Sequence, residues 1–146
     1  MRNLYLDIDG TLVMRGGVPA PGLVAFLSFV TENFDCYWLT THCQGDANTV
    51  FLYLVGRVPP EALPYIKHIK PTTWESGKTE AIDFTKPFFW LDDNLFETER
   101  KVLAEHNALE SFIHIDLISN PNQLLEVAEE LSEKGGERLP IPLILS

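Results

Sequence analysis

The sequence predicts an α/β protein with a doubly wound, mostly parallel sheet of five strands and helices on both of its faces. Short apolar runs alternate along the chain with segments whose apolar residues recur at helical spacing, a pattern typical of parallel sheets. Polar residues of types used in catalysis directly follow several of these apolar runs. With 146 residues, of which 45% are hydrophobic, the chain is expected to form one domain over residues 1–146.

Five segments carry the apolar and aromatic residues that are typical of buried strands. These predicted strands are residues 3–7, 35–40, 65–69, 87–91 and 111–116. The third of them contains Lys67 and His68, which a buried strand rarely carries.

Helical spacing and helix-start residues mark a second set of segments. These predicted helices are residues 22–33, 46–56, 76–83, 95–107 and 121–134, with Asp46 as an expected N-cap. Residues 13–21 contain two glycines and two prolines, which predicts a loop or flap. The tail, residues 137–146, is apolar but interrupted by prolines, and we expect it to dock on the body of the protein or on a neighbouring subunit.

The charge balance narrows the classes of partner. The net charge is −10, with 21 acidic against 11 basic residues, which argues against binding along a nucleic-acid backbone. A phosphorylated metabolite remains compatible, because a metal ion and one or two cations suffice to hold it. Two cysteines, Cys36 and Cys43, are too few for a disulfide framework and predict reduced thiols in a cytoplasmic protein. No signal segment and no membrane-spanning run is expected.

The first polar signal is a pair of carboxylates at the end of the predicted strand 3–7. Asp7 and Asp9 are two positions apart, so both lie on the same side of the strand tip, and Gly10 then allows a sharp turn. Like charges held this close repel each other unless a cation lies between them. The pair therefore predicts a site for a hard divalent metal and a nucleophilic carboxylate, although an Asp-Gly turn after a strand is the structural alternative.

Three further signals occur at predicted strand ends or helix starts: Thr40 with Thr41, Lys78, and Asp92 with Asp93. Because the carboxyl ends of parallel strands meet at one edge of a sheet, we expect these residues to converge with the first acid pair. Carboxylates, a hydroxyl and an ammonium group suit phosphoryl transfer. Each also has a structural alternative, namely a strand-ending threonine, a surface lysine and an N-cap pair.

In this order, the segment DIDGTL, the threonine, the lysine and the acid pair resemble the four motifs of the haloacid dehalogenase-like (HAD) phosphatase superfamily. The resemblance spans nearly the whole chain. It implies a doubly wound sheet with strand order 5-4-1-2-3.

The resemblance also implies roles for the acids. Asp7 would be the nucleophile and Asp9 the general acid and base. Mg²⁺ would be bound by the Asp7 carboxylate, by the backbone carbonyl of Asp9, and by Asp92 or Asp93. We rank Asp92 first because it comes first after the strand.

The remaining motif residues would bind the phosphoryl group. The resemblance gives this role to Thr40 and Lys78, helped by backbone amides near Gly10. Thr41 replaces Thr40 if the strand ends one residue later. His42 follows directly and could contact a substrate from the same loop.

One departure from the family is expected. Many HAD-like proteins carry a cap domain, but the segments between Asp9 and Thr40 and between Thr40 and Lys78 are too short for one. A capless member has an open site, which suggests a larger substrate or a homo-oligomer whose neighbouring subunit supplies the lid.

The expected function is therefore a Mg²⁺-dependent phosphomonoester hydrolase that works through an aspartyl-phosphate on Asp7. The alternative is a catalytically inert HAD-like domain that binds a phosphorylated ligand or a protein partner. A phospho-accepting receiver domain fits poorly, because Lys78 precedes an acid pair here. The identity of the substrate is not readable from the sequence.

Overall fold

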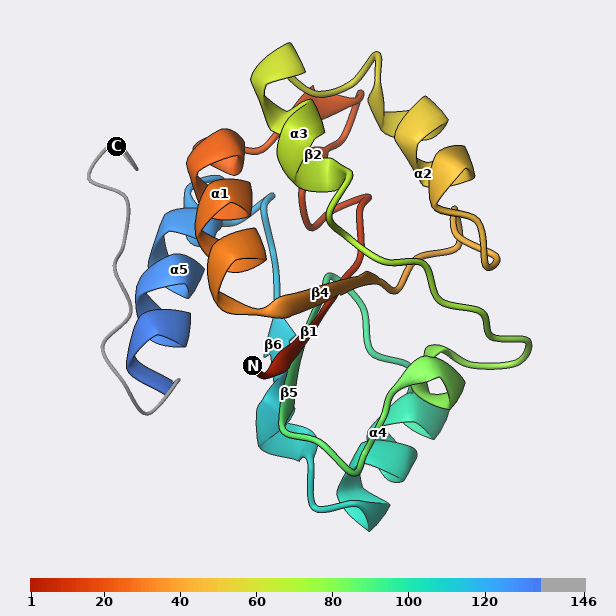
Figure 1. Cartoon of the computed structure of the whole chain (residues 1–146). Coiled ribbons are helices and arrows are strands. Elements are labelled where there is room, and N and C mark those ends of the chain that lie inside the picture. The colour runs from red at the N-terminus through yellow and green to blue at the C-terminus, as the bar shows by residue number, and fades with distance from the viewer. Residues whose placement is uncertain (135–146) are drawn as a thin grey trace.

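The computed structural model describes residues 1–134, so the prediction for the tail at 137–146 lies outside the described residues. Figure 1 shows an α/β arrangement built around a twisted sheet. Four parallel strands form this sheet in the order β4-β1-β5-β6, where β1 is Asn3–Leu6, β4 is Asp35–Trp38, β5 is Phe88–Asp92 and β6 is Phe112–His114. The α/β class and the parallel sheet are thus confirmed, whereas the five-strand order is not.

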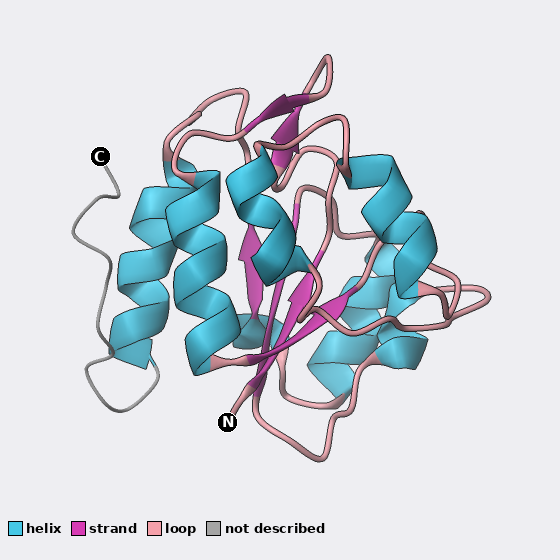
Figure 2. Cartoon of the chain, turned by 45° about the horizontal axis from the view of Figure 1, so that its top comes forward, coloured by secondary structure: helices cyan, strands magenta, loops and turns pink. Residues whose placement is uncertain are grey.

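Helices cover both faces of the sheet. On one side lie α1 (Leu23–Asn33), α3 (Leu63–Ile66) and α5 (Gln123–Lys134), and on the other lie α4 (Glu97–Glu105) and the 3₁₀ turn η2 (Lys78–Ala81) (Figures 1 and 2). The helix α2 (Ala47–Leu54) follows β4, and Asp46 caps it by accepting the amide of Asn48 at 2.9 Å. No helix in residues 1–134 is both long and apolar enough to cross a bilayer.

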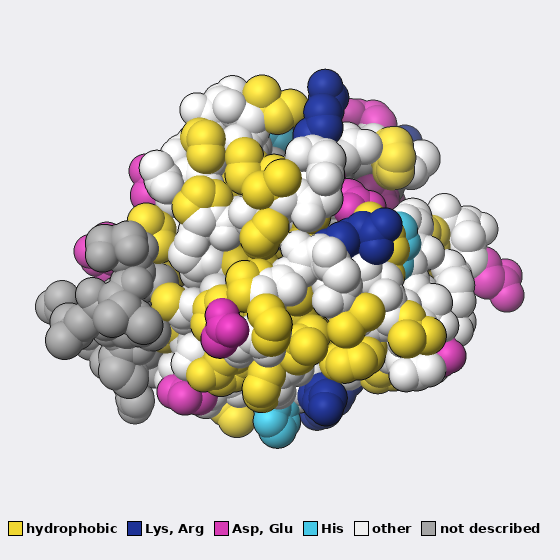
Figure 3. All heavy atoms as spheres, turned by 90° about the horizontal axis from the view of Figure 1, so that it is seen from above, with side chains coloured by type: hydrophobic (Ala, Val, Ile, Leu, Met, Phe, Trp, Pro, Cys, Tyr) yellow, Lys and Arg dark blue, Asp and Glu magenta, His cyan; other side chains and the backbone are white. Residues whose placement is uncertain are grey.

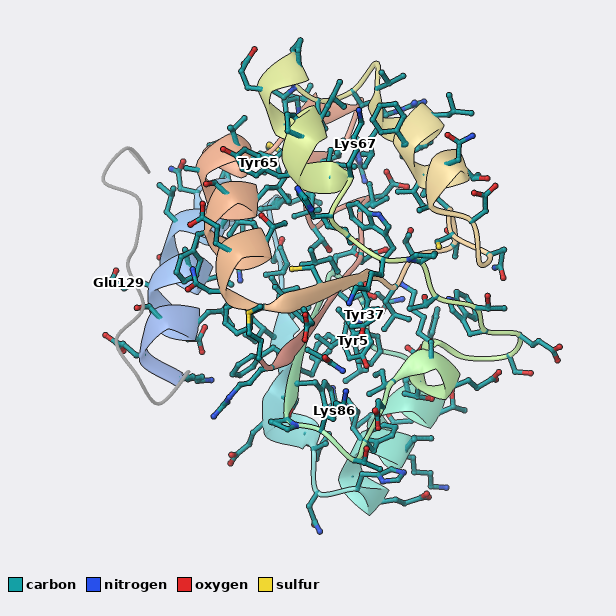
Figure 4. The ribbon with its side chains drawn as sticks, in the orientation of Figure 1. Tyr5, Tyr37, Tyr65, Lys67, Lys86 and Glu129 are labelled. Carbon is teal, nitrogen blue, oxygen red and sulfur yellow. The ribbon has the colours of Figure 1, made fainter. Side chains whose placement is uncertain are left out.

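The two faces arise from the alternation of side chains along each strand. In β1, Leu4 and Leu6 belong to the core beneath α1 and α5, whereas Tyr5 belongs to the core beneath α4. Tyr5 stacks against Tyr37 of β4 with ring centroids 5.4 Å apart, and the two rings lie side by side in Figure 4. Trp90 of β5 is fully buried on the same face.

The predicted strand at residues 65–69 is wrong. Pro64 occupies the first turn of α3, where a proline is well tolerated. Ile66 and Ile69 both enter the core three positions apart, which is helical rather than alternating spacing. Beyond α3, Lys70 alone pairs with the β4 edge: its amide donates to the carbonyl of Cys36 at 2.9 Å. Only Lys70 therefore pairs with β4 where the fifth strand was predicted.

The predicted flap at residues 13–21 contains a small antiparallel hairpin of β2 (Val13–Met14) and β3 (Val18–Pro19). Gly16 and Gly17 close it with φ values of 85° and 78°, which favour glycine. The hairpin stands at the end of the sheet opposite the N-terminus (Figure 2). In the described part of the chain, this flap and α1 are all that separates β1 from β4, so no cap is inserted there.

Candidate active site

The functional side chains lie where the central strands end. Leu6 pairs in register with Leu91, which places Asp7, the residue after β1, beside Asp92, the last residue of β5. The amide of Asp7 donates to the carbonyl of Leu91 at 3.1 Å and holds this alignment. A cavity of about 300 Å³ opens here, lined by Asp7, Asp9, Thr41, Trp74, Ser76, Gly77, Lys78, Asp92, Asp93, Asn94, Phe96 and Glu99.

Lys78 links the two strand tips. Its Nζ lies 2.6 Å from Oδ2 of Asp92 and 3.3 Å from Oδ1 of Asp7, and all three side chains are largely buried. Burial alone would lower the pKa of Lys78, but the charges of Asp7 and Asp92 outweigh it and raise that pKa. The ammonium group therefore stays charged at neutral pH and compensates the neighbouring Asp92 carboxylate.

Asp7 has the most perturbed carboxyl of the site. Burial and then the neighbouring Asp92 carboxylate raise the pKa of Asp7 to about 8, against the opposing effect of Lys78. Without a further cation, this carboxyl keeps its proton near neutral pH. A metal ion at the same place would displace the proton.

The carboxylate cluster of Asp7, Asp92 and Asp93 fits a hard divalent cation. One oxygen from each residue lies within 4.8 Å of the others, and carboxylate oxygens are the ligands that Mg²⁺ prefers. Burial and the contact with Asp92 raise the pKa of Asp93. Asp92 already accepts hydrogen bonds from Nζ of Lys78 and, at 3.1 Å, from the amide of Asn94. Asp93 is exposed.

Gly10 is required next to this cluster for two reasons. Its φ of +80° is one that side chains rarely adopt, and a Cβ at this position would lie 2.2 Å from Oδ2 of Asp93. The turn after β1 and the acid pair after β5 thus fit together only with glycine here. The amide of Gly10 donates to the carbonyl of Val13 at 2.8 Å, so it is already occupied.

Asp9 lines the same cavity as the buried carboxylates but makes its hydrogen bonds with other side chains. Its side chain is 57% exposed, and its two oxygens lie 2.7 Å from the Tyr53 hydroxyl and 2.7 Å from Nε2 of His42. The rings of His42 and Tyr53 stack at 3.7 Å. Partial burial would raise the pKa of Asp9, but the hydrogen bonds from His42 and Tyr53 outweigh burial and lower it.

The two threonines after β4 take different places. Thr40 is buried, and its Oγ1 accepts the amide of His42 at 3.3 Å. Thr41 is exposed and lines the cavity with Asp7 and Lys78. The strand β4 ends at Trp38, before either threonine.

Sequence reasoning missed two contributors. Glu99 is buried, and its Oε2 accepts the amide of Lys78 at 3.2 Å while Oε1 accepts the amide of Phe96 at 3.0 Å. A glutamate in the first turn of a helix was the available signal for this role. Tyr53 had no such signal, because the apolar spacing of α2 assigns it to a core face.

Comparison of this chain with protein-family models, with curated proteins and with solved structures finds no match.

Proposed function

We propose that this protein is a divalent-metal-dependent phosphomonoester hydrolase of the HAD-like type, with Asp7 as the nucleophile and Mg²⁺ as the metal. The observation that carries the proposal is the bridge of Lys78 between Asp7 and Asp92 at the tips of adjacent parallel strands, with Asp93 completing a carboxylate cluster. Strand tips of this kind are where open α/β sheets bind ligands. The resemblance of the four motifs to the HAD superfamily supports the same chemistry.

In the proposed reaction, an oxygen of Asp7 attacks phosphorus and the bond to the leaving-group oxygen breaks. Asp9 must bind a proton before this step, because its hydrogen bonds lower its pKa. It gives that proton to the leaving-group oxygen and then takes one from water, whose oxygen attacks phosphorus and releases the Asp7 carboxylate. Lys78 balances the negative charge of the phosphoryl oxygens. Thr41 lines the same cavity, and its hydroxyl donates a hydrogen bond to a phosphoryl oxygen. Mg²⁺, held by the carboxylate cluster and the Asp9 carbonyl, would supply charge neutralisation and orient the phosphoryl group.

The test is the hydrolysis of 4-methylumbelliferyl phosphate by the purified chain in Mg²⁺ and in EDTA. We expect Mg²⁺-dependent turnover that Asp7→Asn abolishes. Asp35→Asn is the matched control, because Asp35 begins β4 and pairs with Asn3, at the end of the strands opposite to the site. Equal rates in the wild type and in Asp7→Asn would contradict the proposal.

One observation favours a second candidate, a domain that binds phosphorylated ligands without turnover. Both carboxylate oxygens of Asp9 are engaged by His42 and Tyr53 outside the cluster, as in a site where Asp9 transfers no proton. Beryllofluoride with Mg²⁺ mimics an acyl phosphate. A rise in melting temperature on its addition supports the hydrolase, and no rise together with retained binding of phosphate esters supports the binding domain.

A further inference from the structure

Two arginines near Asp9 form no ion pair in the described residues. Within residues 1–134 neither Arg15 nor Arg57 has a carboxylate oxygen within the 4.0 Å of an ion pair. Figure 3 looks onto this end of the molecule and shows Lys and Arg side chains beside a histidine and acidic groups.

Both arginines line one hollow that adjoins the candidate active site. It has a volume of about 360 Å³ and lies between the flap and α2. Its lining includes Asp9 and Gly10, and Asp9 also lines the cavity that contains Asp7. Arg15 further lines a hollow of about 540 Å³ on the other side, together with Asp9 and Asp93. Asp9 therefore connects the cavity at Asp7 with the hollow that contains these cations.

Arg57 is held in position by the residue that binds Asp9. Its guanidinium carbon lies 4.0 Å from the ring centroid of Tyr53, and its Nη1 donates to the Tyr53 carbonyl at 2.6 Å. Tyr53 in turn donates its hydroxyl to Asp9. The flap approaches Arg57 closely, because a Cβ at Gly17 would lie 3.7 Å from the Arg57 side chain, in van der Waals contact. The guanidinium is pre-organised and keeps donors free for a ligand.

We propose that Arg15 and Arg57 form a second anion subsite, so that the substrate is a phosphomonoester whose leaving group carries its own carboxylate or phosphate. This inference rests on the proposed function and names the substrate class of that site. Guanidinium groups match the planar geometry of carboxylate and phosphate oxygens. Two such charges outweigh the single charge of Asp9, which already has two hydrogen-bond partners of its own.

The test compares substrates that differ by one anionic group. For a carboxylate the pair is 3-phosphoglycerate and glycerol 3-phosphate, and for a phosphate it is fructose 1,6-bisphosphate and fructose 6-phosphate. The pair with the larger ratio of kcat/KM values identifies the second anion. We expect the preferred pair to differ by about 10- to 100-fold, the effect of one or two hydrogen bonds to a charged group.

Arg15→Gln with Arg57→Gln should reduce that ratio to near one. The control is Arg2→Gln, because Arg2 lies over Phe89 at the N-terminal end of the sheet and should keep the wild-type ratio. Ratios near one in the wild type for both pairs overturn the inference, and so does a ratio that survives in the double variant.

A binding measurement separates this inference from the proposed hydrolysis. Isothermal titration of Asp7→Asn, which should not turn over, compares 3-phosphoglycerate with glycerol 3-phosphate, and likewise the two fructose phosphates, in Mg²⁺. Tighter binding of the doubly anionic ligand, lost with both arginines replaced, supports the subsite even if the wild type hydrolyses nothing. Equal binding within both pairs overturns the subsite even if the wild type is an active phosphatase.

Discussion

The buried carboxyl of Asp7 should make the metal-free protein less stable as the pH rises. In an unfolded chain an aspartate has a pKa of about 3.9. In the folded protein, burial and Asp92 raise the pKa of Asp7 to about 8. Between these values the folded state holds a proton that the unfolded state has released. The stabilising contribution is therefore complete below pH 4, falls as the pH rises, and is lost above pH 8.

The size of the stability change follows from the pH interval between the two pKa values of Asp7. Each pH unit in which the folded state holds one extra proton changes the free energy of unfolding by about 1.36 kcal/mol. From pH 5 to pH 8, the contribution of Asp7 should therefore fall by about 3–4 kcal/mol. Asp7→Asn has no titrating carboxyl and should lose this dependence. At pH 8 the variant should be the more stable protein.

The assay is urea unfolding in EDTA at pH 5, 6, 7 and 8 for the wild type and for Asp7→Asn. Subtracting the two free energies of unfolding at each pH removes the contributions of the titrating groups that do not interact with Asp7. Asp35→Asn serves as the control and should follow the wild type. If the curves for the wild type and Asp7→Asn run parallel within about 1 kcal/mol, Asp7 does not hold a proton in the folded state and the reasoning is refuted.

Three other perturbations test the site. Lys78→Met should lower the free energy of unfolding in EDTA at pH 7 by about 3 kcal/mol, because the buried Asp92 carboxylate loses its cation. The exposed control Lys101→Met should change it by less than about 0.5 kcal/mol in the same urea titration. Gly10→Ala should lower the free energy of unfolding by about 1–3 kcal/mol and weaken Mg²⁺ binding in isothermal titration. Gly56→Ala, at an open position, is the control. An unchanged Mg²⁺ affinity of Gly10→Ala would contradict the packing of the turn against the acids. Tyr53→Phe keeps the ring but removes a hydrogen bond to the carboxylate that lowers the pKa of Asp9, so this pKa should rise in a carbon-13 NMR titration, and an unchanged value would exclude the bond in solution.

The parts of the site that lie on strand tips could be predicted from the sequence. Asp7 and Asp92 follow apolar runs, and the register of parallel strands brings them together without any further information. The side chains that reach in from other elements could not. Glu99 and Tyr53 lie on helices. The first-turn position of Glu99 marks a carboxylate that caps its own helix, but no local pattern marks Glu99 as reaching Lys78 or Tyr53 as reaching Asp9.

The same limit explains the error at residues 65–69. Five apolar and polar residues fit a strand or a helix equally well, and the choice depends on which of them the core accepts. Here the core accepts Ile66 and Ile69, and the proline at position 64 suits a helix start. The two threonines after β4 show the same limit. The strand ends at Trp38, Thr40 is buried, and Thr41 lines the cavity. A sequence locates such strand ends only to within a few residues.

The single-residue pairing beyond β4 has a consequence for how the protein keeps apart from its own copies. The exposed border of a sheet is a template onto which another chain can add a strand, and lysine and proline at such a border oppose this. At the β4 border the pairing ends with Lys70, and Pro71 follows without an N–H to offer. An incoming strand therefore finds no continuous row of donors and acceptors there, and copies of this chain are hindered from joining by strand addition at this border.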